Sequence, residues 1–253
     1  MNDSDNVPLV AVAHGSQDER SAHAVEMIFQ RVRRLRPELD VRVAYLDHVE
    51  PGAEEAITGL AAEGAGEVVV LPTLLTAAYH STVDLPTVLA RVRESCPWLR
   101  VHYGETLGPH PLLLDAVERR LAEAGVTPDP ATALVLASAG SSDATANATI
   151  SALTDQLAAR GAWGRVIPAF ASMASPTPGE AVARLRESGA ARVAVASYLL
   201  APGFFADRVA DQASAAGAAA VSPALADTPE LAWLVLERYE EARSRKPSVV
   251  SGS

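Results

Sequence analysis

Apolar residues along the chain form short continuous runs that alternate with longer stretches of helical spacing. The first run, Val7–Ala13, ends at His14, and a helical pattern then continues up to Pro37. Val68–Leu71 is a second continuous run, as expected of a strand that is covered on both faces. The other segments of the first half are a strand at 41–46, a helix from Pro51 to about Gly64, a helix at 85–95, a strand at 100–103 and a helix from Pro111 that ends before Gly125. This alternation predicts a parallel, doubly wound α/β sheet.

The second half of the chain repeats the first at an offset of 125 residues. Turn residues and apolar residues coincide at this one offset, which chance does not readily produce. The matching pairs include Gly15 with Gly140, Ser16 with Ser141, Tyr45 with Phe170, Pro51 with Pro176, Leu60 with Leu185, Gly64 with Gly189, and Leu74–Leu75 with Leu199–Leu200. We therefore expect two similar doubly wound halves of flavodoxin-like topology with a cleft between them, each a four-stranded sheet in the order 2-1-3-4.

The boundaries of the two halves are placed where the periodic spacing of apolar residues ends. The N-terminal half spans residues 7–124 and the C-terminal half spans residues 132–243. Residues 125–131, which contain two prolines, are interpreted as a linker. The tails, residues 1–6 and 245–253, are expected to be disordered.

Composition narrows the functional classes. The chain has 253 residues and a formal net charge of −10, which makes duplex nucleic acid an unfavourable partner. The single cysteine, Cys96, excludes a disulfide framework and is interpreted as a packing residue. The longest apolar stretch, around 68–79, is interrupted by Pro72 and is shorter than the roughly 18 residues of a membrane span. We therefore expect a cytoplasmic protein that binds neither nucleic acid nor membranes.

Three potential metal ligands follow successive strands of the first half. His14 follows the first strand, Asp47 follows the second, and His80 lies in the segment after the third. The carboxyl ends of parallel strands meet at one edge of a sheet, where ligands of such folds bind. Two imidazoles and a carboxylate suit Fe²⁺, Co²⁺ or Ni²⁺ and leave coordination positions open. The sequence therefore predicts a metal site at this edge, with Glu50 as the alternative to Asp47.

The repeat provides an internal comparison for this site. At the offset of 125, the three positions are occupied by Ala139, Ser172 and Phe205, none of which is a strong metal ligand. All six histidines of the chain lie in the first half. The pattern indicates one active half and one half that is kept for its shape.

The other histidines are assigned as follows. His48 is interpreted as a solvated neighbour of Asp47. His23 lies on the first helix and His102 lies within a strand, so structural roles are favoured for both. His110 precedes a helix, and its role is left open.

An ordered set of motifs then identifies a family. A first strand that ends in His-Gly-Ser is followed by Tyr-Leu-Asp-x-x-Glu-Pro and by Leu-Pro-x-Leu-Leu-x-x-x-x-His-x-x-x-Asp-Leu-Pro. This set resembles the sirohydrochlorin chelatases, in their long, two-half form, over about residues 7–242. The resemblance implies a lyase that inserts Fe²⁺ or Co²⁺ into sirohydrochlorin and releases two protons, with no permanently bound cofactor.

The resemblance also implies roles for individual residues. The metal-binding histidines of the family fall on His14 and His80, and its acidic ligand, usually glutamate, falls on Asp47. His14 and His80 are expected to share the roles of metal ligand and proton acceptor, in an order that the sequence leaves open. Gln17 stands where the family often has arginine.

The eight carboxylates of sirohydrochlorin require local donors on an acidic protein. Helix starts offer backbone N–H groups, and nearby arginines offer charge. An aromatic side chain could also contact the macrocycle. The expected substrate-binding residues are Ser16, Gln17, Arg20, Ser141, Ser142, Phe205 and Arg208.

The leading hypothesis is a monomeric sirohydrochlorin ferrochelatase for sirohaem synthesis. One alternative keeps the reaction but inserts Co²⁺, for cobalamin synthesis. The other is a non-catalytic carrier of the metal or the tetrapyrrole, which would bind stoichiometrically without turnover.

Overall fold

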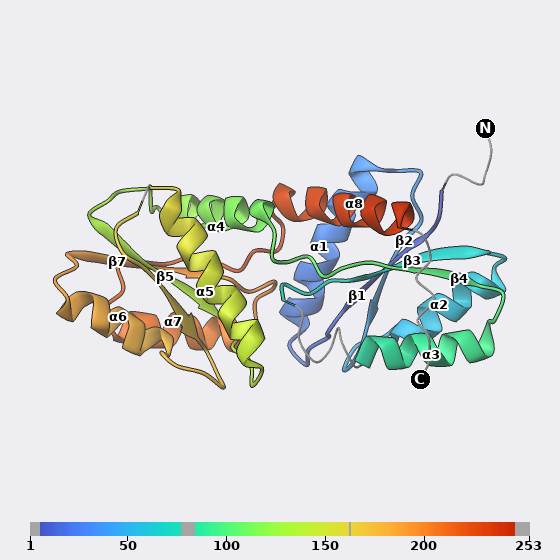
Figure 1. Cartoon of the computed structure of the whole chain (residues 1–253), viewed down its shortest axis with the longest axis horizontal. Helices are drawn as coiled ribbons and strands as arrows, with labels where there is room; N and C mark the ends of the chain where they lie inside the picture. The colour runs from blue at the N-terminus through green and yellow to red at the C-terminus, as the bar shows by residue number, and fades with distance from the viewer. Residues whose placement is uncertain (1–5, 77–83, 162, 246–253) are drawn as a thin grey trace. The chain divides into compact units, whose positions relative to one another are not determined.

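Two parallel sheets organise the chain, and the central strand of each is buried along its whole length. The computed structural model describes residues 6–76, 84–161 and 163–245 (Figure 1). In the first sheet the central strand is β1 (Leu9–Ala13), and in the second it is β5 (Thr132–Ser138). Both are continuous apolar runs apart from their ends, which suits strands with helices on both faces.

The described chain divides into two compact units. Unit 1 comprises the described residues up to Gly108 and from Ala232 onward, and unit 2 comprises 109–231. Unit 1 contains, besides β1, α1 (Glu19–Leu35), β2 (Val41–Tyr45), α2 (Ala53–Ala62), β3 (Glu67–Pro72), α3 (Leu85–Ser95) and β4 (Arg100–Tyr103). Unit 2 contains, besides β5, α4 (Pro111–Glu123), α5 (Ala144–Ala159), β6 (Val166–Phe170), α6 (Pro178–Glu187), β7 (Arg192–Ser197), α7 (Phe204–Ala215) and β8 (Ala220–Val221). The last helix, α8 (Pro229–Ser244), begins in unit 2 and continues in unit 1.

Both sheets are parallel, with strand orders β2-β1-β3-β4 and β6-β5-β7-β8. The predicted fold class, with two four-stranded sheets in the order 2-1-3-4, is therefore confirmed. In unit 1, α2 and α3 share one apolar core with β1 and β3, and in unit 2, α6 and α7 share one with β5 and β7. No helix in the described part of the chain is long and apolar enough to span a bilayer.

The face of each sheet that α2 and α3, or α6 and α7, leave uncovered is covered by one helix from each half of the sequence. Figure 1 shows α1 and α8 on this face in unit 1, and Arg36, at the end of α1, forms an ion pair of 3.1 Å with Glu240 of α8. In unit 2 the corresponding helices are α5 and α4. There Arg160, at the end of α5, binds Asp115 and Glu118 of α4 at 2.7 Å each.

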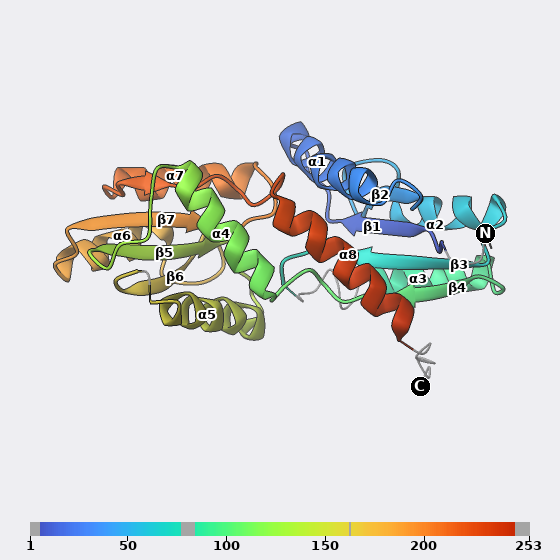
Figure 2. The ribbon, with the colours of Figure 1, turned by 90° about the horizontal axis from the view of Figure 1, so that it is seen from above.

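The compact units thus follow a different division from the repeats in the sequence. The N-terminal half, 7–124, includes α4, yet α4 belongs to unit 2; the C-terminal half, 132–243, includes most of α8, which belongs to unit 1. Hydrophobic periodicity predicts that α4 and α8 each bury one face, but it carries no information about which sheet receives that face. The chain passes from one unit to the other in two segments, one before α4 and one at the start of α8 (Figure 2).

The offset of 125 residues holds through the third strand of each sheet and then changes. β6, α6 and β7 lie 125 residues after β2, α2 and β3 at both ends. α7 begins at Phe204 whereas α3 begins at Leu85, so the offset has fallen to 119 there. Phe205 lies in the first turn of α7, whereas His80 precedes α3, so the expected match between these two residues is wrong. A shorter connection after β7 is the reason.

Polar contacts hold α8 at its middle and at its first turn. Arg238 is 8% exposed, and its guanidinium donates to the carbonyl oxygens of Thr106 and Leu107. The hydroxyl of Tyr239 donates to the carbonyl oxygen of Val7 at 2.7 Å. In the first turn, Glu230 accepts three hydrogen bonds of 2.6–3.0 Å from Arg119 of α4.

The Arg119–Glu230 pair should contribute to acid stability. Burial opposes ionisation of Glu230, but hydrogen bonds from Arg119 and from a backbone N–H outweigh it and hold the pKa of this carboxyl below its ordinary value of 4.5. A lowered pKa in the folded state stabilises the protein above the ordinary value, and this contribution is lost as the pH falls through the lowered one. Because Arg119 is half exposed, we expect Glu230→Gln to cost only about 1–2 kcal/mol at pH 7.

Urea unfolding at pH 7 and at successively lower pH below 4.5 tests this expectation. The difference between wild type and Glu230→Gln should shrink as the pH falls. Glu54→Gln, which removes one partner of the exposed Arg91–Glu54 pair, is the control and should change stability by less than about 0.5 kcal/mol. A Glu230→Gln deficit that is independent of pH would show that the ion pair is not its cause.

Candidate functional site

The imidazole of His14 lies at the carboxyl end of β1, where it is half-buried. Its Nδ1 atom is 3.0 Å from the carbonyl oxygen of Gly15. Because a carbonyl oxygen can only accept, Nδ1 carries the proton in this contact, and Nε2 of the neutral ring carries a lone pair. A hydrogen bond from the second ring nitrogen to a backbone carbonyl is the arrangement that typically orients a metal-binding histidine.

The loops that follow β1 and β2 are locked together. The backbone N–H of Asp47 donates to the carbonyl oxygen of His14 at 3.0 Å, and that of Leu46 donates to Ala13. Gly15 has φ +93°, and a Cβ atom there would lie 1.8 Å from the carbonyl oxygen of Asp47. Glycine is therefore required, and the backbone of Asp47 is held beside that of His14.

The side chain of Asp47 turns toward His48. Asp47 Oδ1 accepts from the backbone N–H of His48 at 2.8 Å, and Oδ2 lies 3.2 Å from His48 Nε2. The two side chains remain 64% and 38% exposed. The interpretation of His48 as a solvated neighbour agrees with this exposure, and its ring also contacts the carboxylate that it follows.

Glu50, the alternative acidic ligand, has a different local role. Its Oε2 accepts from the backbone N–H of Gly52 at 2.9 Å, and Gly52 is the residue that precedes α2. An acidic group at the start of a helix is stabilised by the unpaired N–H groups there. Of the two acids, Asp47 is the one joined to the His14 loop.

His80, the third predicted ligand, lies outside the described residues. Within residues 6–76, 84–161 and 163–245, no three His, Cys, Asp or Glu side chains are grouped closely enough to hold one metal ion. The three-ligand site, with His14, Asp47 and His80, stays a prediction.

The second unit repeats this loop pair with different side chains. A Cβ atom on Gly140, which has φ +83°, would lie 2.0 Å from the carbonyl oxygen of Ser172. The N–H of Ser172 donates to Ala139 at 2.9 Å, as that of Asp47 does to His14. Met173 has φ +60°, close to the +64° of His48. The backbone is thus retained while imidazole, carboxylate and imidazole are replaced by methyl, hydroxyl and thioether.

The expected substrate-binding residues have local partners. Arg20 forms an ion pair of 2.6 Å with Asp18, and Asp18 also caps α1. Ser16 Oγ accepts from the N–H of Asp18. Gln17 and Arg208 are exposed. Since exposed ion pairs contribute little, Arg20 could exchange Asp18 for another carboxylate at small cost.

In the second half, the expected donors to substrate carboxylates are at Ser141 and Ser142, and the N–H of Ser141 already has a partner. The backbone N–H of Ser141 donates to Asn147 Oδ1 at 3.0 Å, and Ser141 Oγ accepts from Asp143. The Ser141 N–H is therefore already paired within its own loop, and the contribution of Ser141 to substrate binding stays a prediction. Ser142 is exposed, and its contribution stays a prediction.

Exposed apolar side chains at the carboxyl edge of the second sheet add to the predicted set. Phe205 is 39% exposed, Phe204 is 67% exposed, and their rings meet edge to face at 5.4 Å. Met173, after β6, is 75% exposed. The fixed offset of 125 predicted only Phe205 as an aromatic contact. The sequence Gly-Phe-Phe at 203–205 would have predicted both aromatic residues.

The remaining histidines of the described residues either make local structural contacts or lie exposed on a helix. His102 Nε2 lies 2.8 Å from Glu67 Oε2, and this contact lowers the pKa of Glu67. His110 caps α4 by accepting from the N–H of Leu112 at 3.3 Å. His23 is exposed on α1. The structural roles expected for His102 and His23 agree with these positions.

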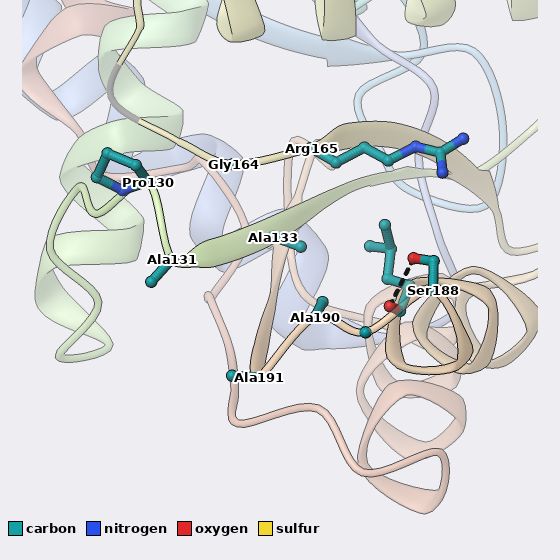
Figure 3. Close-up of a pocket in the computed structure, with 10 residues that line it drawn as sticks. Pro130, Ala131, Ala133, Gly164, Arg165, Ser188, Ala190 and Ala191 are labelled. Carbon is teal, nitrogen blue, oxygen red and sulfur yellow. Dashed lines mark hydrogen bonds between the residues drawn. The ribbon is translucent and has the colours of Figure 1, made fainter.

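A pocket of about 500 Å³ lies in unit 2, at the opposite edge of the sheet from these loops (Figure 3). Its walls come from the start of β5, the residues before β6 and the turn between α6 and β7. Figure 3 shows Arg165 extending away from Pro130 and Ala131. The pocket therefore brings no further functional group to the site.

Together the fold and the site define a class: a repeated α/β protein in which one sheet edge carries an imidazole and a carboxylate and the equivalent positions of its repeat carry neither. A model of the CbiX family matches residues 8–124 and again 133–242. The chain belongs to the CbiX family.

Relatives and solved structures agree with this assignment. The chain is 29% identical over 204 residues to a sirohydrochlorin cobaltochelatase of Priestia megaterium, covering 79% of this chain and 66% of that protein. It is 26% identical over 207 residues to a sirohydrochlorin ferrochelatase of the same organism, covering 81% and 77%. The structure of SirB from Bacillus subtilis with Fe³⁺ superposes with a TM-score of 0.83 at 22% identity, covering 94% of this chain and 96% of that one, which shows a shared fold.

The close approach of the two loops can be tested in the second unit, where no metal ligand is involved. Gly140→Ala should destabilise the protein by at least about 3 kcal/mol, because the added Cβ atom displaces the Ser172 carbonyl and the residue keeps a positive φ. Gly64→Ala is the matched control, since Gly64 has φ +101° but nothing within 4 Å of the added atom. It should cost about 1 kcal/mol.

Urea unfolding followed by circular dichroism gives both values. Equal losses for the two variants would mean that the loop pair yields easily to the added atom, and that it does not hold the residues of the site in place.

Proposed function

We propose that this protein is a sirohydrochlorin chelatase, which inserts a divalent metal ion into the macrocycle and releases two protons. The observation that supports this most directly is the contrast between the two sheet edges. The same loop pair carries His14 and Asp47 in one unit and Ala139 and Ser172 in the other. The names of the relatives, which include a ferrochelatase and a cobaltochelatase, support the same reaction.

The reaction requires two kinds of group from the protein. The ion must exchange water for the nitrogens of the macrocycle, and a base must accept the two pyrrole protons. His14 presents Nε2 with a lone pair, which serves either as ligand or as proton acceptor. We assign the other of these two roles to His80 and place the ion against Asp47.

Residues from both halves of the sequence are proposed to contact the macrocycle. Phe205, with Phe204 beside it, offers an aromatic surface. Arg208 follows Phe204 by one helical turn, so an exposed cation and an aromatic ring share one side of α7. Arg20, Ser16, Gln17 and Ser142 are the proposed contacts to the carboxylates at other points of the ring.

The choice of metal follows the same chemistry. Imidazole and carboxylate ligands suit Fe²⁺ and Co²⁺ alike. We propose Fe²⁺ insertion, for sirohaem, as the first candidate and Co²⁺ insertion, for cobalamin, as the second. The net charge of −10 and the buried thiol of Cys96 are compatible with a monomer that works in the cytoplasm without nucleic acid or membrane partners.

Steady-state metallation tests the proposal. Purified protein should convert many equivalents of sirohydrochlorin with Co²⁺, or with Fe²⁺ in the absence of oxygen, followed by absorbance of the macrocycle. His14→Ala should lower kcat/KM at least roughly a hundredfold, because it removes a ligand or the base. His23→Ala, which removes an exposed histidine of α1, is the control and should match wild type.

Two outcomes would contradict the proposal. Binding of the macrocycle at one equivalent without turnover would identify a carrier. Turnover that is unchanged in His14→Ala would place the chemistry elsewhere in the chain.

The aromatic surface of α7 gives a second prediction. Phe205→Ala should raise the KM for sirohydrochlorin about tenfold and change kcat by less than about threefold, because it removes contact with the macrocycle but no reacting group. Trp98→Ala removes a more exposed aromatic side chain, 66% against 39% for Phe205, between α3 and β4 and should leave both constants unchanged. A loss confined to kcat in Phe205→Ala would exclude a role in binding alone.

A further inference from the structure

The pair formed by Asp47 and His48 presents two metal-binding atoms at the surface of the protein. Asp47 Oδ2 and His48 Nε2 are 3.2 Å apart, and both side chains are partly exposed. The second Asp47 oxygen is held by the backbone N–H of His48. Both side chains therefore have a fixed relation to one short segment of backbone.

The separation of the two atoms is the one that a shared metal ion requires. Bonds of about 2.0–2.2 Å from nitrogen or oxygen to a first-row divalent ion, at angles of about 90–110°, place neighbouring ligand atoms about 2.8–3.6 Å apart. The observed 3.2 Å lies within this range. An ion could therefore bind between these two atoms without a change in the loop, once the imidazole proton resides on Nδ1.

The backbone of this segment is set by the fold, whereas its chemistry is set by the side chains. His48 has φ +64°, and Met173 at the equivalent position has φ +60°. The repeat therefore keeps the unusual conformation with a methionine, which is 75% exposed and beside a serine. The conformation does not need histidine, so the imidazole at position 48 calls for another explanation.

We propose that Asp47 and His48 form a capture site for the divalent metal substrate, with His48 as a metal ligand in its own right. The inference rests on the proposed function, since it names the route by which the ion reaches the His14 loop. Two protein ligands leave most of the coordination shell to water, which suits an ion that is transferred onward. The N–H of Asp47 is bonded to the carbonyl oxygen of His14, so the capture site adjoins the loop of the expected acceptor.

Binding of Co²⁺ alone tests the proposal without the macrocycle. Calorimetry and the visible absorption of bound Co²⁺ should show binding to wild type that His48→Ala weakens about 10- to 100-fold. In the metallation assay the KM for Co²⁺ should rise by a similar factor, while kcat and the KM for sirohydrochlorin change by less than about threefold. His23→Ala is the matched control and should bind Co²⁺ as wild type does.

His48→Gln separates a ligand from a residue that only positions Asp47. Glutamine can donate a hydrogen bond to the carboxylate but lacks the imidazole nitrogen. We expect it to bind Co²⁺ as weakly as His48→Ala. Recovery of wild-type affinity in His48→Gln would overturn the ligand role.

The remaining outcomes are also decisive. Equal Co²⁺ affinity in His48→Ala and wild type, or no Co²⁺ binding by wild type, would overturn the capture site. Loss of Co²⁺ binding in His48→Ala in a protein that never metallates sirohydrochlorin would support the site and contradict the proposed function instead.

Discussion

Gly15 lies so close to the carbonyl oxygen of Asp47 that no larger residue fits, and this contact determines where the functional side chains are placed. It joins the ends of β1 and β2, two neighbouring strands whose carboxyl ends form one edge of the sheet. The imidazole of His14 and the carboxylate of Asp47 therefore project from loops whose backbones are hydrogen-bonded to each other. The same contact in the second unit, between Gly140 and Ser172, shows that the loop pair forms without any of these side chains.

Strand order and most elements could be predicted from the sequence, because they depend on local signals. Continuous apolar runs such as Val68–Leu71 identify strands covered on both faces, and Pro111 and Gly125 mark the ends of α4. The fixed offset of the repeat also led to Ala139 and Ser172 as the positions that lack the imidazole of His14 and the carboxylate of Asp47. These inferences need only periodicity, turn residues and one internal comparison.

Other features depend on tertiary contacts that no local pattern encodes. The exchange of α4 and α8 between units is one example, since both helices have an apolar face that either sheet could accept. The shorter connection after β7 is another, and it made Phe205 a false counterpart of His80. Side-chain direction is a third: Glu50 turns to the start of α2 and Asp47 turns to His48, and both choices follow from backbone geometry that forms only in the folded loop.

We expect the metal ion to bind at the carboxyl edge of the first sheet and not at the equivalent edge of its repeat. Diffraction from crystals of the protein soaked in Co²⁺, recorded at the cobalt absorption edge, tests it most directly. The account predicts an anomalous peak within about 2.0–2.3 Å of His14 Nε2, with Asp47 or His48 in the same coordination shell and no peak beside Ala139 and Ser172. A Co²⁺ ion bound away from this edge, with neither His14 nor the Asp47–His48 pair coordinated, would contradict it.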